Sequence, residues 1–256
     1  QMSGVMSSTL ICLKTRCGIG VIITMVKRYV AAIMPIVLCL AFFSAVVFRR
    51  TAPVSNITSP SPTVILDAGH GGFDGGAVAS DGTVEKDINL KIALTAEKLL
   101  QFNGFEVIMT RTEDTATEDD SSAVTAVRKR SDLKNRLALM KKYPNSVYVS
   151  IHLNKFTTTA ASGSQVFYAK GQERSELLGN CIQKSVVTML QPENKRTVKP
   201  GTSKVFLLDN AVVPAVIVEC GFLSNHRELE LLKNEDYQTK LAFAVTAGIT
   251  DYFSEE

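Results

Sequence analysis

Short apolar runs rich in β-branched residues alternate with segments of helical periodicity from residue 63 onward, and this alternation constrains the fold most. The runs are TVILD (63–67), FEVIMT (105–110), SVYVSIHLN (146–154), GSQVFYA (163–169), KVFLL (204–208) and AVIVECGFL (215–223). Helices are expected at 85–103, 131–143, 173–190 and 237–253. Strands that alternate with helices form mostly parallel sheets with helices on both faces. The sequence therefore predicts an α/β fold: a single domain over 63–256, with a mixed, mostly parallel sheet of about six strands flanked by helices.

One long stretch of this domain has neither pattern. Residues 111–130, RTEDTATEDDSSAVTAVRKR, contain few apolar side chains and many charged ones. A segment without apolar periodicity has little to bury against a core. We expect it to be a long surface loop.

The N-terminal part is different in composition. Residues 29–48, YVAAIMPIVLCLAFFSAVVF, contain no charge, and 20 uncharged, mostly apolar residues are long enough to span a bilayer as a helix. Basic residues are more numerous before this segment than after it, which places the N-terminus in the cytoplasm. No clean signal-peptidase site follows, so we expect an uncleaved transmembrane signal-anchor over 29–48. Residues 1–28 are then an N-terminal cytoplasmic segment or extension, and the Ser- and Pro-rich residues 49–62 a linker.

Charge and cysteine content exclude several functional classes. Of the 28 basic residues, six lie in the first 50 positions, where there is no acid, so the remainder has more acidic than basic side chains. This balance argues against nucleic acid as a partner. Only Cys181 and Cys220 lie in the predicted domain, too few for a disulfide framework or a zinc ribbon. We expect both to be small buried hydrophobes.

Four titratable residues interrupt the apolar patterns at corresponding places. His70 follows the first predicted strand, His152 and Glu219 lie near the ends of two others, and Glu85 opens the first long helix. Ligands of α/β sheets bind outside the carboxyl ends of the strands. We therefore expect the four side chains to converge on one rim of the sheet.

Two imidazoles and a carboxylate are a common ligand set for catalytic zinc, which keeps one position open for water. A further carboxylate that is not a ligand can transfer protons to and from the reacting groups. Glu219 follows four apolar residues and would be costly to bury without a partner. The sequence thus contains the parts of a zinc-dependent amide hydrolase.

Other polar residues carry weaker signals. Asp67, the last residue of its run, is a candidate to orient a metal ligand by hydrogen bonding. Asp74 and Asp81 lie in loop sequence, where aspartate commonly makes turns. His226 lies in SNHRELELL, a polar helix start, and is expected to be exposed.

Five ordered motifs carry a resemblance to a known family. ILDAGHGGFDGGA, EKDINL, VIMTR, SIHLN and IVECGFLSN resemble the zinc-dependent N-acetylmuramoyl-L-alanine amidases of the Amidase_3 family, over residues 63 to 253. The likeness is greatest to the membrane-anchored, germination-specific branch that acts on spore cortex. The sequence departs from the family at Ala68, where proline is frequent, and this change is expected to alter loop stiffness more than chemistry.

The resemblance implies roles for the four residues. It makes His70, Glu85 and His152 the ligands of one catalytic Zn²⁺ and Glu219 the general acid/base. The implied reaction hydrolyses the amide between N-acetylmuramic acid and L-alanine in peptidoglycan, with cortex remodelling for muramic-δ-lactam formation and germination as its setting. The expected partners are peptidoglycan or cortex, the membrane through the N-terminal helix, and an activating or targeting protein. The catalytic domain is then on the extracytoplasmic, cell-wall side.

Two alternatives and one regulatory question stay open at this level. A zinc peptidase or carboxypeptidase acting on wall peptides would use the same metal chemistry, and a non-catalytic peptidoglycan-binding protein would use the same surface. Some relatives carry an inserted helix that plugs the site. Here the stretch between His152 and Glu219 must already hold two strands and a helix, which predicts an uncovered site.

Overall fold

The computed structural model describes residues 25–40 and 61–255, which fall in two separate units that divide after Ser59. Residues 25–40 form a helix. The predicted membrane segment 29–48 is described only as far as residue 40, and most of the predicted linker lies outside the described residues. No helix in the described ranges is both long and apolar enough to cross a membrane. The transmembrane segment therefore stays a prediction.

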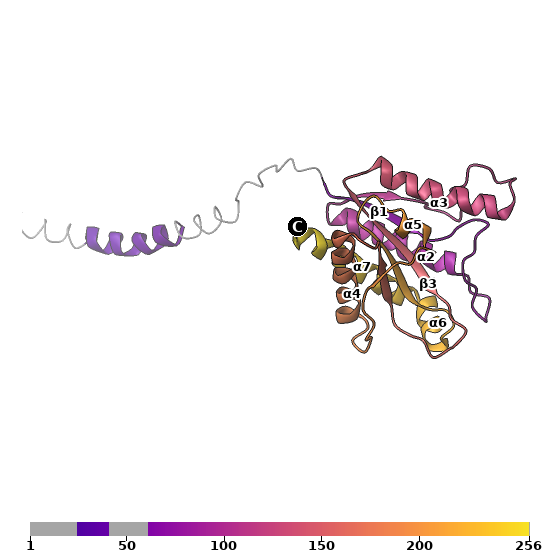
Figure 1. Cartoon of the computed structure of the whole chain (residues 1–256). Coiled ribbons are helices and arrows are strands. Elements are labelled where there is room, and N and C mark those ends of the chain that lie inside the picture. The colour runs from indigo at the N-terminus through magenta and orange to yellow at the C-terminus, as the bar shows by residue number, and fades with distance from the viewer. Residues whose placement is uncertain (1–24, 41–60, 256) are drawn as a thin grey trace, which may run out of the picture. The chain divides into compact units, whose positions relative to one another are not determined.

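The second unit is an α/β domain around a six-stranded sheet (Figure 1). The strands are β1 (Thr63–Ala68), β2 (Glu106–Met109), β3 (Ser146–Asn154), β4 (Gln165–Tyr168), β5 (Lys199–Pro200) and β6 (Ala215–Phe222). Their order is β2-β1-β3-β6-β4-β5. The first four strands in this order are parallel to one another. β4 runs antiparallel to β6, and β5 is parallel to β4. The predicted mixed, mostly parallel sheet is confirmed.

Helices cover both faces of this sheet. They are α2 (Glu85–Phe102), α3 (Thr125–Lys142), α4 (Glu173–Met189), α5 (Phe206–Asp209), α6 (His226–Lys233) and α7 (Glu235–Glu255). α7 packs against α2, α4 and α6, and the core under them takes alternate strand residues such as Val149 and Ile151. α3 and α5 lie over the other face, where Tyr148 is buried. This face is covered by fewer helices.

Two elements differ from the prediction. Residues 204–208 were expected to form a strand, but the chain turns at Val205 and Phe206–Asp209 form α5. The two consecutive leucines of α5 are both buried, as a helical turn allows and an alternating strand does not. Lys199–Pro200 pairs with β4 instead, at the sheet edge where proline is tolerated.

The predicted loop 111–130 is shorter than expected, because α3 begins at Thr125. Its first turns expose Val127 and are held by polar contacts, so they show no apolar periodicity. Arg128 donates to Glu118 of the preceding loop and stacks on Phe73, with its guanidinium carbon 3.8 Å from the ring centroid. Tertiary ion pairs thus extend a helix that local sequence does not predict.

Candidate active site

Parallel strands bring the four predicted site residues to one rim of the sheet. His70 comes two residues after β1, His152 lies near the end of β3 and Glu219 near the end of β6. Glu85 is the first residue of α2, and the glycine-containing segment 69–84 connects β1 to this helix. Residues His152 and Glu219 are paired in register on neighbouring strands. The expected convergence is therefore what the structure shows.

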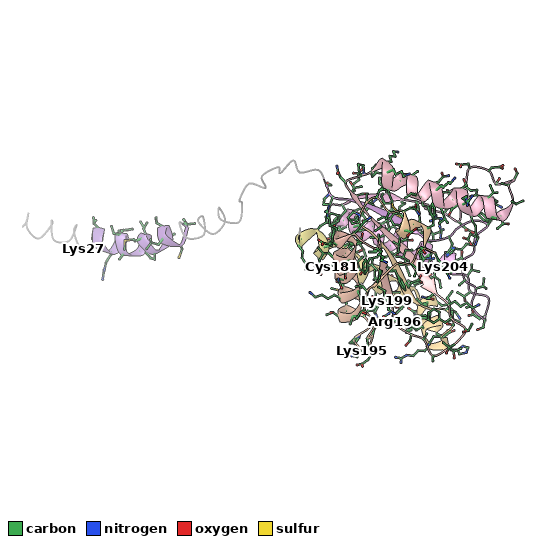
Figure 2. The ribbon with its side chains drawn as sticks, in the orientation of Figure 1. Lys27, Cys181, Lys195, Arg196, Lys199 and Lys204 are labelled. Carbon is green, nitrogen blue, oxygen red and sulfur yellow. The ribbon has the colours of Figure 1, made fainter. Side chains whose placement is uncertain are left out.

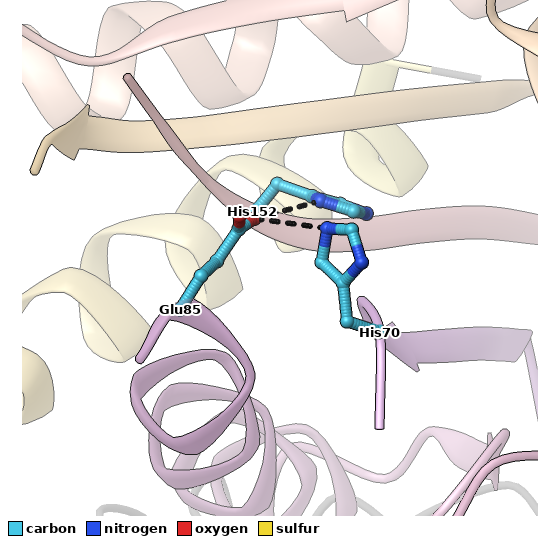
Figure 3. A group of neighbouring side chains, drawn as sticks. All are labelled: His70, Glu85 and His152. Carbon is cyan, nitrogen blue, oxygen red and sulfur yellow. Dashed lines mark hydrogen bonds and ion pairs between the residues drawn. The ribbon is translucent and has the colours of Figure 1, made fainter. Parts of the chain in front are cut away.

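Figure 3 shows the Glu85 carboxylate facing both imidazole rings. Its Oε1 lies 3.0 Å from Nδ1 of His152 and 3.3 Å from Nε2 of His70. Potential ligand atoms of the three residues all lie within 4.8 Å of one another. Their role as metal ligands stays a prediction, but the cluster has the required donors and separation.

Backbone geometry shows why glycines surround this cluster. His70 has φ of 63°, in the left-handed region that non-glycine residues rarely occupy. A Cβ atom on Gly69 would come within 2.2 Å of the His152 ring. Gly76 has φ of 70°, and a Cβ there would lie 2.6 Å from both Glu85 and His70. The loop must therefore be glycine at these positions for the three side chains to meet.

The electrostatics of the cluster favour opposite charges on its members. Burial alone would raise the pKa of Glu85, but hydrogen bonds with His152 and His70 hold it below its ordinary value. Burial opposes the charged form of His70, but hydrogen bonds with Asp74 and Glu85 raise its pKa to about 9. Glu85 also accepts backbone hydrogen bonds from Ala77 and Leu153. Its carboxylate is thus ionised and fixed in place.

Asp74, rather than Asp67, orients a histidine. His70 donates from Nδ1 to Asp74 at 2.9 Å, which leaves Nε2 toward Glu85. Lys129 of α3 lies 3.0 Å from the other Asp74 oxygen. The prediction that Asp67 holds a ligand is wrong: its carboxylate accepts from Tyr148, Ser150 and other buried donors. Alternation along β1 turns Asp67 toward the α3 side, away from the glycine loop.

Two buried arginines hold the backbone of the His70 loop, and sequence reasoning missed both. Arg111 donates to the carbonyls of Ala68 and Gly69 at 2.9 and 3.2 Å. Arg136 donates to the His70 carbonyl at 2.8 Å and is ion-paired with Asp67. Burial would destabilise the Arg136 charge, but Asp67 raises its pKa above the ordinary value. Arg111 ends the VIMTR motif that carries the family resemblance, whereas nothing in the local sequence distinguishes Arg136 from the other basic residues.

Glu219 has a different environment from Glu85. Burial is the largest cause that raises its pKa, to about 7, and the negative charge of Glu85 adds to it. Its buried Oε2 accepts no hydrogen bond from the described residues. A carboxyl group with a pKa near neutrality is suited to both accept and donate a proton.

The described part of the domain leaves the site accessible. Between β3 and β6 the chain forms only β4, α4, β5 and α5 as regular elements. The side chains of His70 and His152 remain 24% and 19% exposed. The predicted uncovered site is therefore confirmed for these residues. His226 is exposed, and Cys181 and Cys220 are buried free thiols, as predicted.

A family model for N-acetylmuramoyl-L-alanine amidases, Amidase_3, matches residues 64–251, which is most of the chain and contains all four site residues. The chain belongs to this amidase family. The enzyme class predicted from the five motifs is confirmed: these enzymes hydrolyse the amide between N-acetylmuramic acid and L-alanine.

Individual amidases of the family resemble this one over most of its length. The germination-specific N-acetylmuramoyl-L-alanine amidase of Bacillus subtilis (strain 168) is 35% identical over 193 residues, covering 75% of this chain and 80% of that protein. The CwlD amidase from Clostridioides difficile, solved in complex with the GerS lipoprotein, is 40% identical with a TM-score of 0.74, covering 77% of this chain and all of that one. An N-acetylmuramoyl-L-alanine amidase from Clostridium difficile 630 is 29% identical, with a TM-score of 0.67.

Proposed function

We propose that this amidase is a zinc enzyme of the spore cortex, with His70, Glu85 and His152 as metal ligands and Glu219 as general acid/base. The observation that supports the proposal is the position of a partly buried carboxyl group, Glu219, paired in register with one ligand of a two-histidine, one-glutamate cluster.

The residues present fit zinc. Two histidine nitrogens and one carboxylate oxygen form the ligand set of many catalytic zinc sites. One histidine, His70, also has its second ring nitrogen held by Asp74, an arrangement that typically orients zinc-bound histidines. The other carboxylate oxygen of Glu85 is held by the Ala77 amide, so Oε1 is fixed toward both rings. The cluster therefore provides donors in fixed orientation.

When bound, zinc supplies a Lewis acid that polarises the substrate carbonyl and makes water more acidic. Glu219 accepts a proton from the attacking water and donates it to the alanine nitrogen as the amide bond breaks. The buried arginines Arg111 and Arg136 hold the His70 loop in its strained conformation throughout.

The names of two relatives support the cellular setting. The Bacillus relative is germination-specific, and the Clostridioides relative forms a complex with a lipoprotein. We assign this chain to cortex remodelling, with a protein partner that activates or targets it. Residues 29–48 would anchor it in the membrane, with the catalytic domain on the cell-wall side.

The test uses the full chain, loaded with zinc in detergent and incubated with cortex sacculi. Mass spectrometry should find free stem peptides beginning with L-alanine and glycan strands with unsubstituted lactyl groups. A chelator should abolish both products. Shortened stems that remain attached to muramic acid would instead identify a peptidase, and tight cortex binding without any product would identify a binding protein.

Replacing Asp74 with Asn is expected to weaken zinc binding by about 10- to 100-fold, because the His70 ring loses its carboxylate partner. Competition with a chromophoric chelator measures this change. Asp81→Asn is the matched control, since Asp81 lies in the same connection but pairs with Lys233. Equal affinities for both variants would contradict the assigned role.

Zinc binding at pH 7 is expected to release about one proton. The pKa of His70 is about 9 without metal, so this ring is protonated at pH 7 and must lose a proton to become a ligand. The apparent affinity should rise about tenfold per pH unit up to about pH 9. Calorimetry in buffers of different ionisation enthalpy counts the protons, and affinity that does not change between pH 6.5 and 8.5 would refute this expectation.

A further inference from the structure

A row of polar side chains crosses three neighbouring strands on the less covered face of the sheet. His152 of β3 is paired with Glu219 of β6, which is paired in turn with Gln165 of β4. Their neighbours Ile151 and Val218 enter the core under α2, α4 and α7, so the row lies on the opposite face. The row thus continues from the proposed zinc site past Glu219 to Gln165.

Arg196 is fixed at the end of this row. It donates from Nη1 to the Gln165 side-chain oxygen at 2.9 Å and from Nε to the Ser162 carbonyl at 2.6 Å. Its guanidinium carbon lies 4.6 Å from the ring centroid of Phe222, which follows Glu219 on β6. Both hydrogen-bond acceptors are neutral, so the side chain is held in place without compensation of its charge.

Among the described residues, the side chain of Arg196 contacts only neutral groups, although it is partly buried. It lines a hollow of about 840 Å³ between the 160–163 and 190–196 segments and α6. Two carboxylates line this hollow: Glu228 of α6, which accepts from the backbone amides of Gly163 and Phe222, and Glu193, which is exposed and forms no ion pair with Arg196 among the described residues. A fixed guanidinium with a free edge is suited to bind a carboxylate.

Other basic residues lie close to Arg196 in the sequence. Residues 195–204 contain four basic side chains and no acid, and Figure 2 labels Lys195, Arg196, Lys199 and Lys204 along this segment. Lys195 and Lys199 are exposed, whereas Arg196 is held by the contacts above. The positive charge of the segment would attract an anionic substrate, and Arg196 has the fixed geometry to recognise it.

Resting on the amidase function proposed above, we propose that Arg196 binds the free α-carboxylate of the D-glutamate at position two of the stem peptide. In peptidoglycan this residue is linked through its γ-carboxyl, which leaves the α-carboxylate ionised. Consecutive Cα atoms lie 3.8 Å apart, so this carboxylate lies roughly 7 Å from the scissile nitrogen. Glu219 on β6 and Gln165 on β4 are paired neighbours, one strand spacing or about 5 Å apart. A stem peptide attacked beside Glu219 therefore places this carboxylate near the side chain of Gln165, which Arg196 contacts.

The test compares two muramoyl-tripeptides that differ only in whether position two is D-isoglutamate or its amide, D-isoglutamine. The zinc-loaded full chain is expected to favour the free acid by about 10- to 100-fold in kcat/KM, the value of a charge-assisted hydrogen bond. Arg196→Gln should lose this preference, because cleavage of the acid falls to the level of the amide. Lys195→Gln, which removes a charge one residue away, should retain it.

Each other outcome contradicts the proposal in a distinct way. Equal cleavage of both substrates by the wild type, or equal losses on both in Arg196→Gln with zinc content intact, would overturn the role of Arg196 while the amidase function stands. A wild type that cleaves neither substrate but trims the peptides would overturn the proposed function, and the assignment of Arg196 with it.

Discussion

Replacing Glu219 with Gln is expected to lower kcat by about 10²- to 10⁴-fold, the range that general acid–base catalysis contributes. Glutamine has nearly the same shape but neither accepts the proton of water nor returns it to the leaving nitrogen. The three predicted ligands are unchanged, so zinc content should be that of the wild type. Stem-peptide release measured by mass spectrometry, together with metal analysis of the same sample, checks both parts.

The matched control for this variant is Glu230→Gln, an exposed glutamate of α6 whose only described ion pair is with Lys233. It should leave kcat unchanged. A Glu219→Gln protein with more than a tenth of wild-type activity would exclude Glu219 as the proton carrier. Loss of zinc from that variant would instead mean that Glu219 takes part in metal binding.

Replacing Arg136 with Met is expected to lower the free energy of unfolding by about 3–5 kcal/mol, the cost of leaving one partner of a buried ion pair alone. Asp67 would then be a buried carboxylate without its cation, and the His70 carbonyl would lose a donor. Denaturant unfolding followed by circular dichroism measures the change. The effect should decrease in acid: Arg136 holds the pKa of Asp67 below its ordinary value, so its contribution is complete above about pH 4 and is lost as the pH falls.

Arg130→Met is the control for this substitution, because Arg130 is exposed on the same helix. Its effect should stay within about 0.5 kcal/mol. Arg136→Lys keeps the positive charge but loses the planar guanidinium group. Its loss in free energy of unfolding should lie between those of Arg136→Met and Arg130→Met. A loss below about 1 kcal/mol in Arg136→Met would show that the Asp67–Arg136 pair does not stabilise the loop.

Local sequence was sufficient to predict those strands and helices whose pattern of apolar residues lies within one segment of the chain. Apolar runs such as 146–154 predict strands because their side chains need burial on both faces, and α2 begins at Glu85 as its periodicity indicates. The four site residues were identifiable for the same reason: each interrupts a local pattern at a strand or helix end, and parallel strands bring such ends together.

Local sequence was insufficient where distant segments compete for the same group. From the sequence, either Asp67 or Asp74 could be the partner of His70. The ion pair between Asp67 and Arg136, which are 69 residues apart in sequence, engages Asp67, so that Asp74 is the carboxylate that contacts His70. The first turns of α3 depend on ion pairs such as Lys129–Asp74 rather than on apolar spacing.

By itself, then, the sequence determined the α/β class, the enzyme family and the residues of the candidate site, because these depend on periodicity and on motifs in order along the chain. The tertiary structure decided which carboxylate orients His70, how Arg111 and Arg136 hold its strained loop, and where Arg196 lies relative to Glu219. Those arrangements depend on hydrogen bonds between residues far apart in sequence, whose partners are selected only when the whole sheet and its helices pack together.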